Sequence, residues 1–286
     1  YRRILYPLMG YLLGLGNPQF IPYALVAINC VSIVLIVFLI GLTLRAYQSS
    51  NSVYQSLFVL VVPGVWIILS LSTADLLNNL FLVAAIYFYR RSRPIYTTTL
   101  LAAACLTRET TLLIWLAFIA TSFYEQKWQQ LRHLLWAWMP LGAWSLYVGQ
   151  RLLPQPTDLK IEGFDFFLGG VIKKFLFALK IGPIIGNLVE ISAFILLISV
   201  LLTTLFLVYK QPKKNQIILG NALVYGLLFS VSSMGILMFQ QGYNRIFIGA
   251  YFLLFLTLAP RFAYLKIAIA AFASVVTAKY LMDLLV

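Results

Sequence analysis

The sequence predicts an all-α protein, a polytopic bundle of transmembrane helices with short half-helices and one extracytoplasmic interfacial helix. Hydrophobic residues make up 62% of the 286 residues and charged residues only 10%, whereas soluble domains carry about 25% charged residues. Apolar stretches close to the roughly 20 residues that a membrane crossing needs recur along the chain. Basic residues gather in the short connections between these stretches, as they do in polytopic membrane proteins.

The first half of the chain begins with a stretch that is too short and too interrupted to span a bilayer. Tyr1–Leu15 contains Pro7 and ends in a turn rich in glycine, which indicates a helix lying on the membrane surface. Pro63 and Gly64 predict a kink in the second crossing, because proline breaks the helical hydrogen-bond ladder. Four crossings are expected in this half: Pro22–Leu44, Val53–Leu71, Leu76–Tyr89 and, interrupted by Pro140, Leu134–Val148.

A long connection, Arg151 to Lys180, opens the second half. Within it, Val171–Leu179 mixes aromatic residues and lysines at helical spacing, which is typical of a helix in the membrane interface. No internal repeat and no soluble domain boundary is found, so residues 1–286 are predicted to form one transmembrane domain. The remaining crossings are expected at Pro183–Tyr209, Ile217–Phe239, Ile246–Leu258 and Ile267–Leu285, with an outer loop at Gln240–Arg245.

A hairpin is predicted at Ile95–Gln126, where two apolar arms, Tyr96–Leu106 and Thr111–Tyr124, are each short for a crossing. Basic residues flank both arms, so the flanks are assigned to the cytoplasm and the tip, with Arg108 and Glu109, to the opposite side. Because the arms are short, the tip is expected below the outer membrane surface. Ionisable side chains at that depth cost free energy, and they are therefore candidates for a functional site. The alternative is a plain turn in which Arg108 and Glu109 pair with each other.

Charged residues are distributed unequally between the two sides. Seven of the eight acidic residues fall on the outer half, with only Glu125 inside, and an outward-facing polar site would explain this. The net charge of +13 is explained by loop anchoring and anionic lipid head groups rather than by nucleic acid. Eleven basic residues in short connections define the cytoplasmic side: Arg45, Arg90, Arg91, Arg93, Lys127, Arg132, Lys210, Lys213, Lys214, Arg261 and Lys266.

Three segments resemble parts of a known family: Tyr1–Leu8 with Gly14–Gly16, Ser70–Leu77, and Ala102–Thr110. In this order they resemble the segment after the first extracytoplasmic loop, the turn between the third and fourth helices, and the short-helix hairpin of GT-C-type glycosyltransferases. This superfamily includes mannosyl- and arabinosyltransferases that take a sugar from a polyprenyl-phosphate carrier to build cell-envelope glycans. The resemblance implies a multi-pass protein of the bacterial inner membrane with its active site on the extracytoplasmic side.

The resemblance also has a gap. The family's usual catalytic acidic residue lies in a loop after the first helix, and that region is absent here. The chain is therefore expected to be a fragment that lacks the first helix and the first extracytoplasmic loop, and no general base is carried over from the family's motif.

Transfer from a lipid phosphate needs cations against the departing phosphate, and arginine suits this role because its planar fork matches phosphate oxygens. Arg108 and Arg245, each in a short outer turn, are the first candidates for binding the donor phosphate. Arg2 and Arg3 are further candidates.

The acceptor hydroxyl needs a carboxylate base, for which Asp75 is the first candidate and Glu109 the second. Alternatively, Asp75 only caps the helix that follows it, since aspartate is a favoured cap residue.

Asp158, Glu162 and Asp165 are candidates for an acceptor groove or for a divalent cation, and an ordinary solvated surface is the alternative. No cluster of Cys and His has the spacing of metal ligands. The expected function is that of an integral membrane glycosyltransferase that moves a sugar from polyprenyl phosphate to a lipid, glycan or protein acceptor. The alternative is a polytopic transporter or flippase of a lipid-linked or small substrate, although the inverted repeats typical of transporters are not found.

Overall fold

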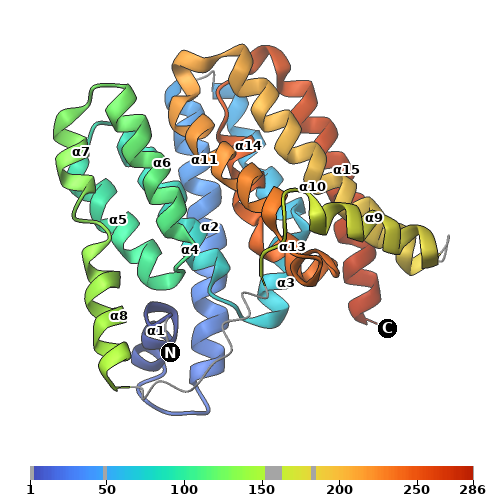
Figure 1. Ribbon diagram of the computed structural model, residues 1–286, viewed down its shortest axis with the longest axis horizontal. Helices are drawn as coiled ribbons and strands as arrows, with labels where there is room; N and C mark the ends of the chain where they lie inside the picture. Colours follow the sequence, from blue (N-terminus) through green and yellow to red (C-terminus); the bar gives the residue numbers. More distant parts are fainter. Residues whose placement is uncertain (1–2, 48–49, 152–162, 182–184, 286) are drawn as a thin grey trace. The chain divides into compact units, whose positions relative to one another are not determined.

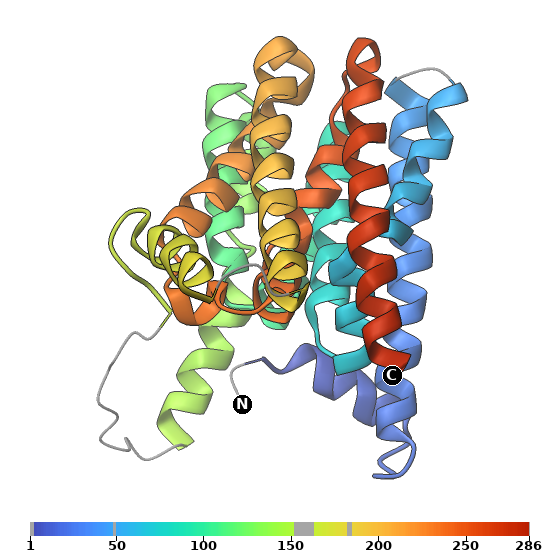
Figure 2. The same ribbon diagram turned by 90° about the vertical axis from the view of Figure 1, so that its right-hand side faces the viewer.

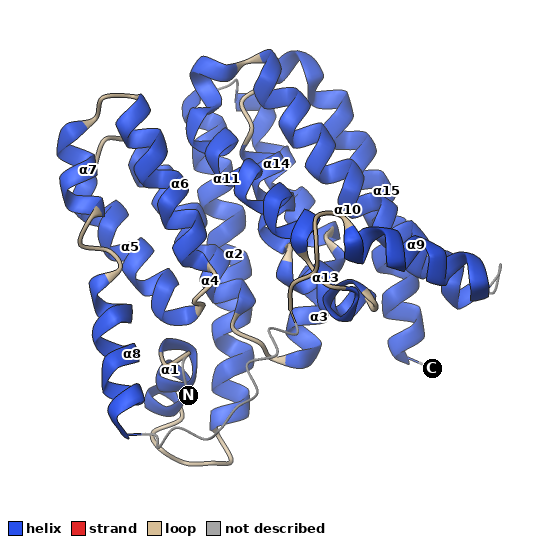
Figure 3. Ribbon diagram, in the orientation of Figure 1, coloured by secondary structure: helices blue, strands red, loops and turns tan. Residues whose placement is uncertain are grey.

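Helices account for nearly all of the secondary structure, as the composition predicts (Figure 3). The computed structural model describes residues 3–47, 50–151, 163–181 and 185–285, and Arg2, Asp158 and Glu162 lie outside these residues. In this part of the chain no strand forms, and one isolated antiparallel bridge joins Phe164 to Ser232. The predicted all-α class is confirmed.

The chain forms two compact units, which are described one at a time. Unit 1 comprises Tyr1–Thr43 and Ile68–Asp158, and unit 2 comprises Leu44–Ile67 and Leu159–Val286. Two helices, α2 (Ile21–Tyr47) and α3 (Pro63–Leu71), therefore each run from one unit into the other. The single transmembrane domain over residues 1–286 stays a prediction.

Unit 1 is organised around α4 (Asp75–Arg90), in which 13 of the 16 residues are buried. A helix that is buried nearly all round belongs to the interior of a bundle, and α5 (Pro94–Thr107) packs along it. Besides these and most of α2, the unit contains α1 (Leu5–Leu13), α6 (Thr111–Tyr124), α7 (Trp128–Leu134) and α8 (Met139–Arg151) (Figure 1).

The predicted hairpin is present as α5 and α6, which are joined by the turn at 108–110. Each arm has 14 residues and is therefore about 21 Å long, against a hydrocarbon core of about 30 Å. The end of α6 lies beside the end of α4, because Tyr89 donates from its hydroxyl to Glu125 at 2.8 Å and Gln130 donates to the Tyr89 carbonyl at 3.1 Å. The tip of the hairpin lies at the other end of α4, where Asp75 begins that helix.

Unit 2 is a second helical bundle. Segments far apart in the sequence meet in it: the Phe58 and Phe255 rings lie 5.8 Å apart, and the Thr277 hydroxyl donates to the Val61 carbonyl at 2.7 Å. Its elements are η1 (Ser50–Val61), most of α3, α9 (Gly169–Ile181), α10 (Ile185–Lys210), α11 (Pro212–Val231), α12 (Met234–Leu237), α13 (Gln240–Ile246), α14 (Ile248–Leu256), η2 (Pro260–Phe262) and α15 (Ala263–Leu285).

Three helical segments are long and apolar enough to cross a membrane: Ile21–Tyr47, Leu188–Lys210 and Pro260–Asp283. A fourth is added if Val53–Val61 and Pro63–Leu71, which are bent by 53°, count as one broken span. The break falls directly before Pro63, because the proline ring and its missing N–H interrupt the helical ladder. The predicted kink is confirmed, and these segments support a membrane protein.

Two of the predicted crossings in this chain are shorter than expected. The segment Leu134–Val148 was predicted to be interrupted by Pro140, and the helix breaks just before it: α7 ends at Leu134 and α8 begins at Met139, so Pro140 lies in the first turn of α8. Proline is favoured there because the first helical N–H groups have no partner within the helix. The other is Ile246–Leu258, where α14 has nine residues, all of them buried. The apolar side chains of α14 therefore pack in the protein interior.

The predicted end of the crossing Ile217–Phe239 and the loop predicted after it were wrong. Helix α11 ends at Val231, and Ser232 takes an extended conformation. The backbone there bonds to another segment, since Ser233 donates to the Gly163 carbonyl at 3.1 Å. Residues predicted as the loop Gln240–Arg245 instead belong to the short helix α13.

The hairpin makes a topological prediction. Thr110 at the tip and Gln129 beyond the base are both exposed, so single cysteines at these positions are expected to react with a membrane-impermeant maleimide from opposite sides of a sealed vesicle. Ser92, also exposed, is the control and is expected to react from the side of Gln129. The native Cys30 and Cys105 are first replaced. Reaction of Thr110→Cys and Gln129→Cys from one side contradicts the hairpin topology.

Candidate functional site

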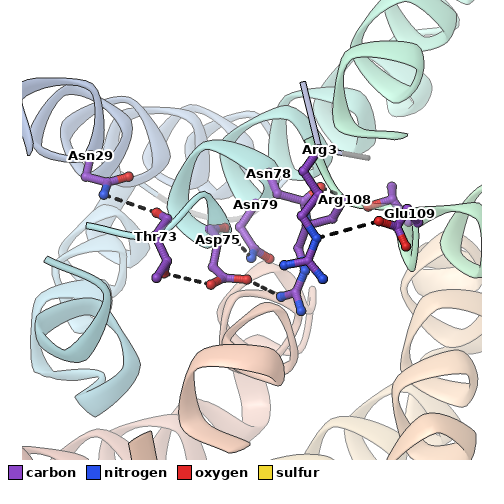
Figure 4. A network of polar contacts seen from close by, with 9 residues as sticks. Arg3, Asn29, Thr73, Asp75, Asn78, Asn79, Arg108 and Glu109 are labelled. Atoms are coloured by element: carbon purple, nitrogen blue, oxygen red, sulfur yellow. Dashed lines mark hydrogen bonds and ion pairs between the residues drawn. The ribbon is translucent and has the colours of Figure 1, made fainter. Parts of the chain in front are cut away.

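A buried ion pair lies at the tip of the hairpin (Figure 4). One terminal guanidinium nitrogen of Arg108 donates to Oδ1 of Asp75, and the two side chains are only 8% and 6% exposed. The two residues are 33 positions apart in the sequence. Asp75 is the first residue of α4, and Arg108 directly follows α5 in an extended conformation. The structure thus brings the first candidate base against the first candidate phosphate ligand.

Neither of the two simpler interpretations fits these residues. Arg108 pairs with Asp75 and not with its neighbour Glu109. The cap position before α4 is taken by Ala74, with no side-chain cap, so Asp75 lies inside the first helical turn. A carboxylate in that turn is still stabilised by the helix macrodipole.

The turn before α4 is fixed by side chains from two other helices (Figure 4). Asn29 of α2 donates to the Thr73 carbonyl at 3.1 Å and to the Tyr6 hydroxyl of α1 at 2.9 Å. The Tyr6 hydroxyl lies 3.1 Å from both the Leu25 and Ser72 carbonyls. Ser72 has a positive φ of 49°, a left-handed conformation that costs energy outside glycine. These contacts hold the turn in place.

The same turn orients the carboxylate. The Thr73 hydroxyl donates to Oδ2 of Asp75 at 2.8 Å, while Arg108 donates to Oδ1. Both carboxylate oxygens therefore have a donor of defined position, and the group presents one fixed face to whatever approaches it.

Several polar residues of the site were not predicted from the sequence as functional, among them Thr73, Asn78 and Thr111. The Thr111 hydroxyl of α6 donates to Asn78 Oδ1 of α4 at 2.8 Å, which ties the start of α6 to the first turn of α4. Asn79 donates to the Asp75 carbonyl at 2.8 Å. Asn78 and Asn79 could have been found from their spacing, because residues three and four positions after Asp75 lie beside it on a helix.

Arg108 retains an unused donor. Its Nε atom is buried and, among the residues that the structure describes, has no hydrogen-bond partner. Leaving a buried donor unpaired costs about 1–3 kcal/mol, so an acceptor oxygen that reaches Nε is favoured. Asp75 engages one terminal nitrogen of the guanidinium, and Nε is left without an acceptor.

Glu109 and Arg3 form a separate and weaker pair beside this site. Their closest atoms, Arg3 Nε and Glu109 Oε1, are 3.7 Å apart, and the side chains are 51% and 40% exposed. Exposed pairs of this kind contribute about 0–1 kcal/mol. Glu109 therefore lies outside the buried cluster.

The other predicted residues that can be placed belong to unit 2. Arg245 lies in the last turn of α13 and is half-buried. Asp165 bonds to Lys173 Nζ at 2.5 Å and accepts the Phe166 N–H at 2.9 Å, and the Lys173 bond, followed by the Phe166 bond, holds the pKa of Asp165 below its usual value. No group of three metal-ligating side chains occurs in the described ranges. The acceptor groove stays a prediction.

Comparisons with known proteins find no matching family model, no similar curated protein and no similar solved structure. The resemblance to GT-C-type glycosyltransferases stays a prediction. What the chain does is inferred from the residues around Asp75 and Arg108.

Proposed function

We propose that the chain is an integral membrane glycosyltransferase. It moves a sugar from a polyprenyl-phosphate carrier to a lipid, glycan or protein acceptor, on the extracytoplasmic face of a bacterial inner membrane. The observation that best supports this proposal is the buried Asp75–Arg108 pair at the hairpin tip, with the Arg108 Nε donor unused. A carboxylate beside a guanidinium provides both groups that such a transfer needs.

The reaction assigns one role to each residue. The acceptor hydroxyl attacks the anomeric carbon of the sugar while the bond from that carbon to the phosphate oxygen breaks. The hydroxyl proton passes to the Asp75 carboxylate, and the bonding electrons leave with the phosphate of the carrier. Arg108 donates through Nε to a phosphate oxygen, where negative charge builds up as the bond breaks.

Pairing in the resting state is consistent with these roles. Burying a lone charge costs several kcal/mol, and an opposite charge in contact offsets part of that cost. Asp75 and Arg108 can therefore both stay at membrane depth before substrate binds. Thr73 keeps the carboxylate oriented while the substrate phosphate competes for the guanidinium.

The position of the site suits a lipid-linked donor. Two arms of about 21 Å place the hairpin tip below the surface of a core about 30 Å thick, if their base lies at the opposite interface. Leu113 and Leu116 on α6 are exposed, at 38% and 49%, and apolar side chains exposed on such a helix are suited to lipid contact. Glu109, Arg2, Arg3 and Arg245 remain secondary candidates.

Replacement of Arg108 by lysine tests the proposal directly. Lysine keeps the charge beside Asp75 but lacks the planar fork, so sugar transfer is expected to fall about tenfold, the equivalent of about 1.4 kcal/mol. The measurement is transfer from a polyprenyl-phosphate sugar to acceptor in membranes, normalised to folded protein. Arg91→Lys is the matched control, because Arg91 is exposed and stacks on Tyr87 at 4.6 Å. Wild-type transfer by Arg108→Lys would remove the guanidinium from the mechanism.

A further inference from the structure

Helix α9 buries one of its three lysines and leaves several apolar side chains exposed. Lys174 is buried, at 3% exposed, whereas Ile172, Leu176 and Leu179 are 51%, 55% and 78% exposed. In a helix that lies on a soluble protein the two kinds of residue take the opposite places. The sequence predicted an interfacial helix with lysines at helical spacing, and it did not reveal that Lys174 is buried.

The inner face of α9 packs against other elements of unit 2. Lys174 Nζ donates to Glu190 Oε1 of α10 at 2.7 Å and to the Met238 carbonyl at 2.5 Å. Glu190 Oε2 also accepts the Gln240 N–H at 3.0 Å, which ties the start of α13 to the same pair. Because a buried charge that loses its partner is strongly destabilising, these bonds fix which face of α9 is turned inward.

The outer face divides into an apolar stripe and a basic flank. Successive helical residues are about 100° apart, from about 3.6 residues per turn, so Ile172, Leu176 and Leu179 lie on one stripe. Lys173 and Lys180 are seven residues apart, or about two turns, and share a flank beside that stripe. Both lysines are exposed, and Lys173 also donates to the Asp165 carboxylate at 2.5 Å.

The neighbouring helix α10 has a matching apolar surface. It contains the candidate span Leu188–Lys210, and Leu188, Ile195 and Leu202 are 49%, 44% and 62% exposed. Their seven-residue spacing places them on one exposed apolar face of that span. In Figure 2, α10 stands upright while α9 is seen nearly end-on, so α9 runs crosswise to a helix that can cross the membrane.

We propose that the outer face of α9 is a binding surface for bilayer lipid. Acyl chains lie against Ile172, Leu176 and Leu179, and anionic head-group phosphates lie against the flank of Lys173 and Lys180. Lys180 favours lipid over a second copy of the chain, because the same lysine on a facing copy would bring like charges together. The apolar stripe continues the lipid-facing surface of α10.

Spin labels on single cysteines test this proposal in vesicles of phosphatidylcholine and phosphatidylglycerol. In a background without Cys30 and Cys105, three positions are labelled: Leu176 on the stripe, Lys180 on the flank and Ala178, which is 6% exposed, on the inner face. Collisions with oxygen, which dissolves in acyl chains, are compared with collisions with a water-soluble nickel chelate. The ratio of oxygen to nickel collisions is expected to be severalfold higher at 176 than at 180, and both collision rates are expected to be low at 178.

Two results would overturn the proposal. Frequent nickel collisions at 176 would place the stripe in water, and low rates for both reagents there would show that protein, such as a second copy, covers it. Circular dichroism and gel filtration of each labelled protein establish that it is folded. Because the readout is lipid contact, its failure leaves the proposed sugar transfer untouched, and failure of the sugar transfer leaves this proposal untouched.

Discussion

Replacing Arg108 with alanine is expected to destabilise the protein by about 3–5 kcal/mol, because Asp75 is left as a buried charge without its partner. Asp75→Asn alone is also expected to destabilise the protein, because it leaves Arg108 as the buried charge without a partner. The double variant Asp75→Asn/Arg108→Gln carries no buried charge at this position, so it is expected to recover most of the lost stability. Unfolding in mild detergent with increasing denaturing detergent measures all four proteins.

The double variant also separates stability from function. If Asp75 is the general base, the double variant folds but loses sugar transfer by about 10²–10⁴-fold, the usual contribution of such a group. Lys279→Gln/Asp283→Asn, which neutralises the exposed pair on α15, is the matched control and is expected to leave both quantities unchanged. A folded double variant with wild-type transfer would make the pair purely structural, and single variants as stable as the wild type would show that the two charges are not coupled.

Gly170→Ala is the second substitution with a large expected effect. A Cβ atom at Gly170, in the first turn of α9, would overlap the Ser232 carbonyl oxygen and lie 2.9 Å from the Ser233 carbonyl carbon. These are backbone atoms. They directly follow Ser230 and Val231, whose carbonyls accept the N–H groups of Leu168 and Asp165 at 2.6 and 2.8 Å. Since the backbone cannot move aside as a flexible side chain can, we expect a loss of about 1–3 kcal/mol.

Gly226→Ala is the control for this substitution. Gly226 lies within α11, and a Cβ atom there would meet nothing within 4 Å. Alanine in a helix interior is favoured over glycine by about 0.5–1 kcal/mol, so this variant is expected to be as stable as the wild type or more so. Equal stability of the Gly170→Ala and Gly226→Ala proteins would contradict the close approach of α9 to residues 232–233.

The sequence was informative where long apolar stretches coincide with basic flanks. The spans at Pro22–Leu44 and Pro183–Tyr209 and the hairpin were predicted nearly to their ends, because length and flanking charge are local signals. The nine residues of α14 were misinterpreted because buried core and lipid-facing surface have the same apolar composition.

The candidate site was predicted as separate residues but not as a pair. Asp75 and Arg108 each stood out as charges beside apolar helix ends. Their contact depends on the packing of α4 against α5 over 33 residues of sequence, and no local pattern encodes it. The burial of Lys174 was missed for the same reason, since only the tertiary fold reveals Glu190 as its partner.

The interleaving of the two units has a consequence for biosynthesis. Element η1 belongs to unit 2, yet it is translated within the part of the chain that builds unit 1. One of its partners, Thr277, follows Val61 by 216 residues, and at about 5–20 residues per second the ribosome needs on the order of 10–40 s to reach it. During that time the carbonyl of Val61 lacks its native donor in the nascent chain. We therefore expect η1 to be the segment most exposed to chaperones and proteases during insertion.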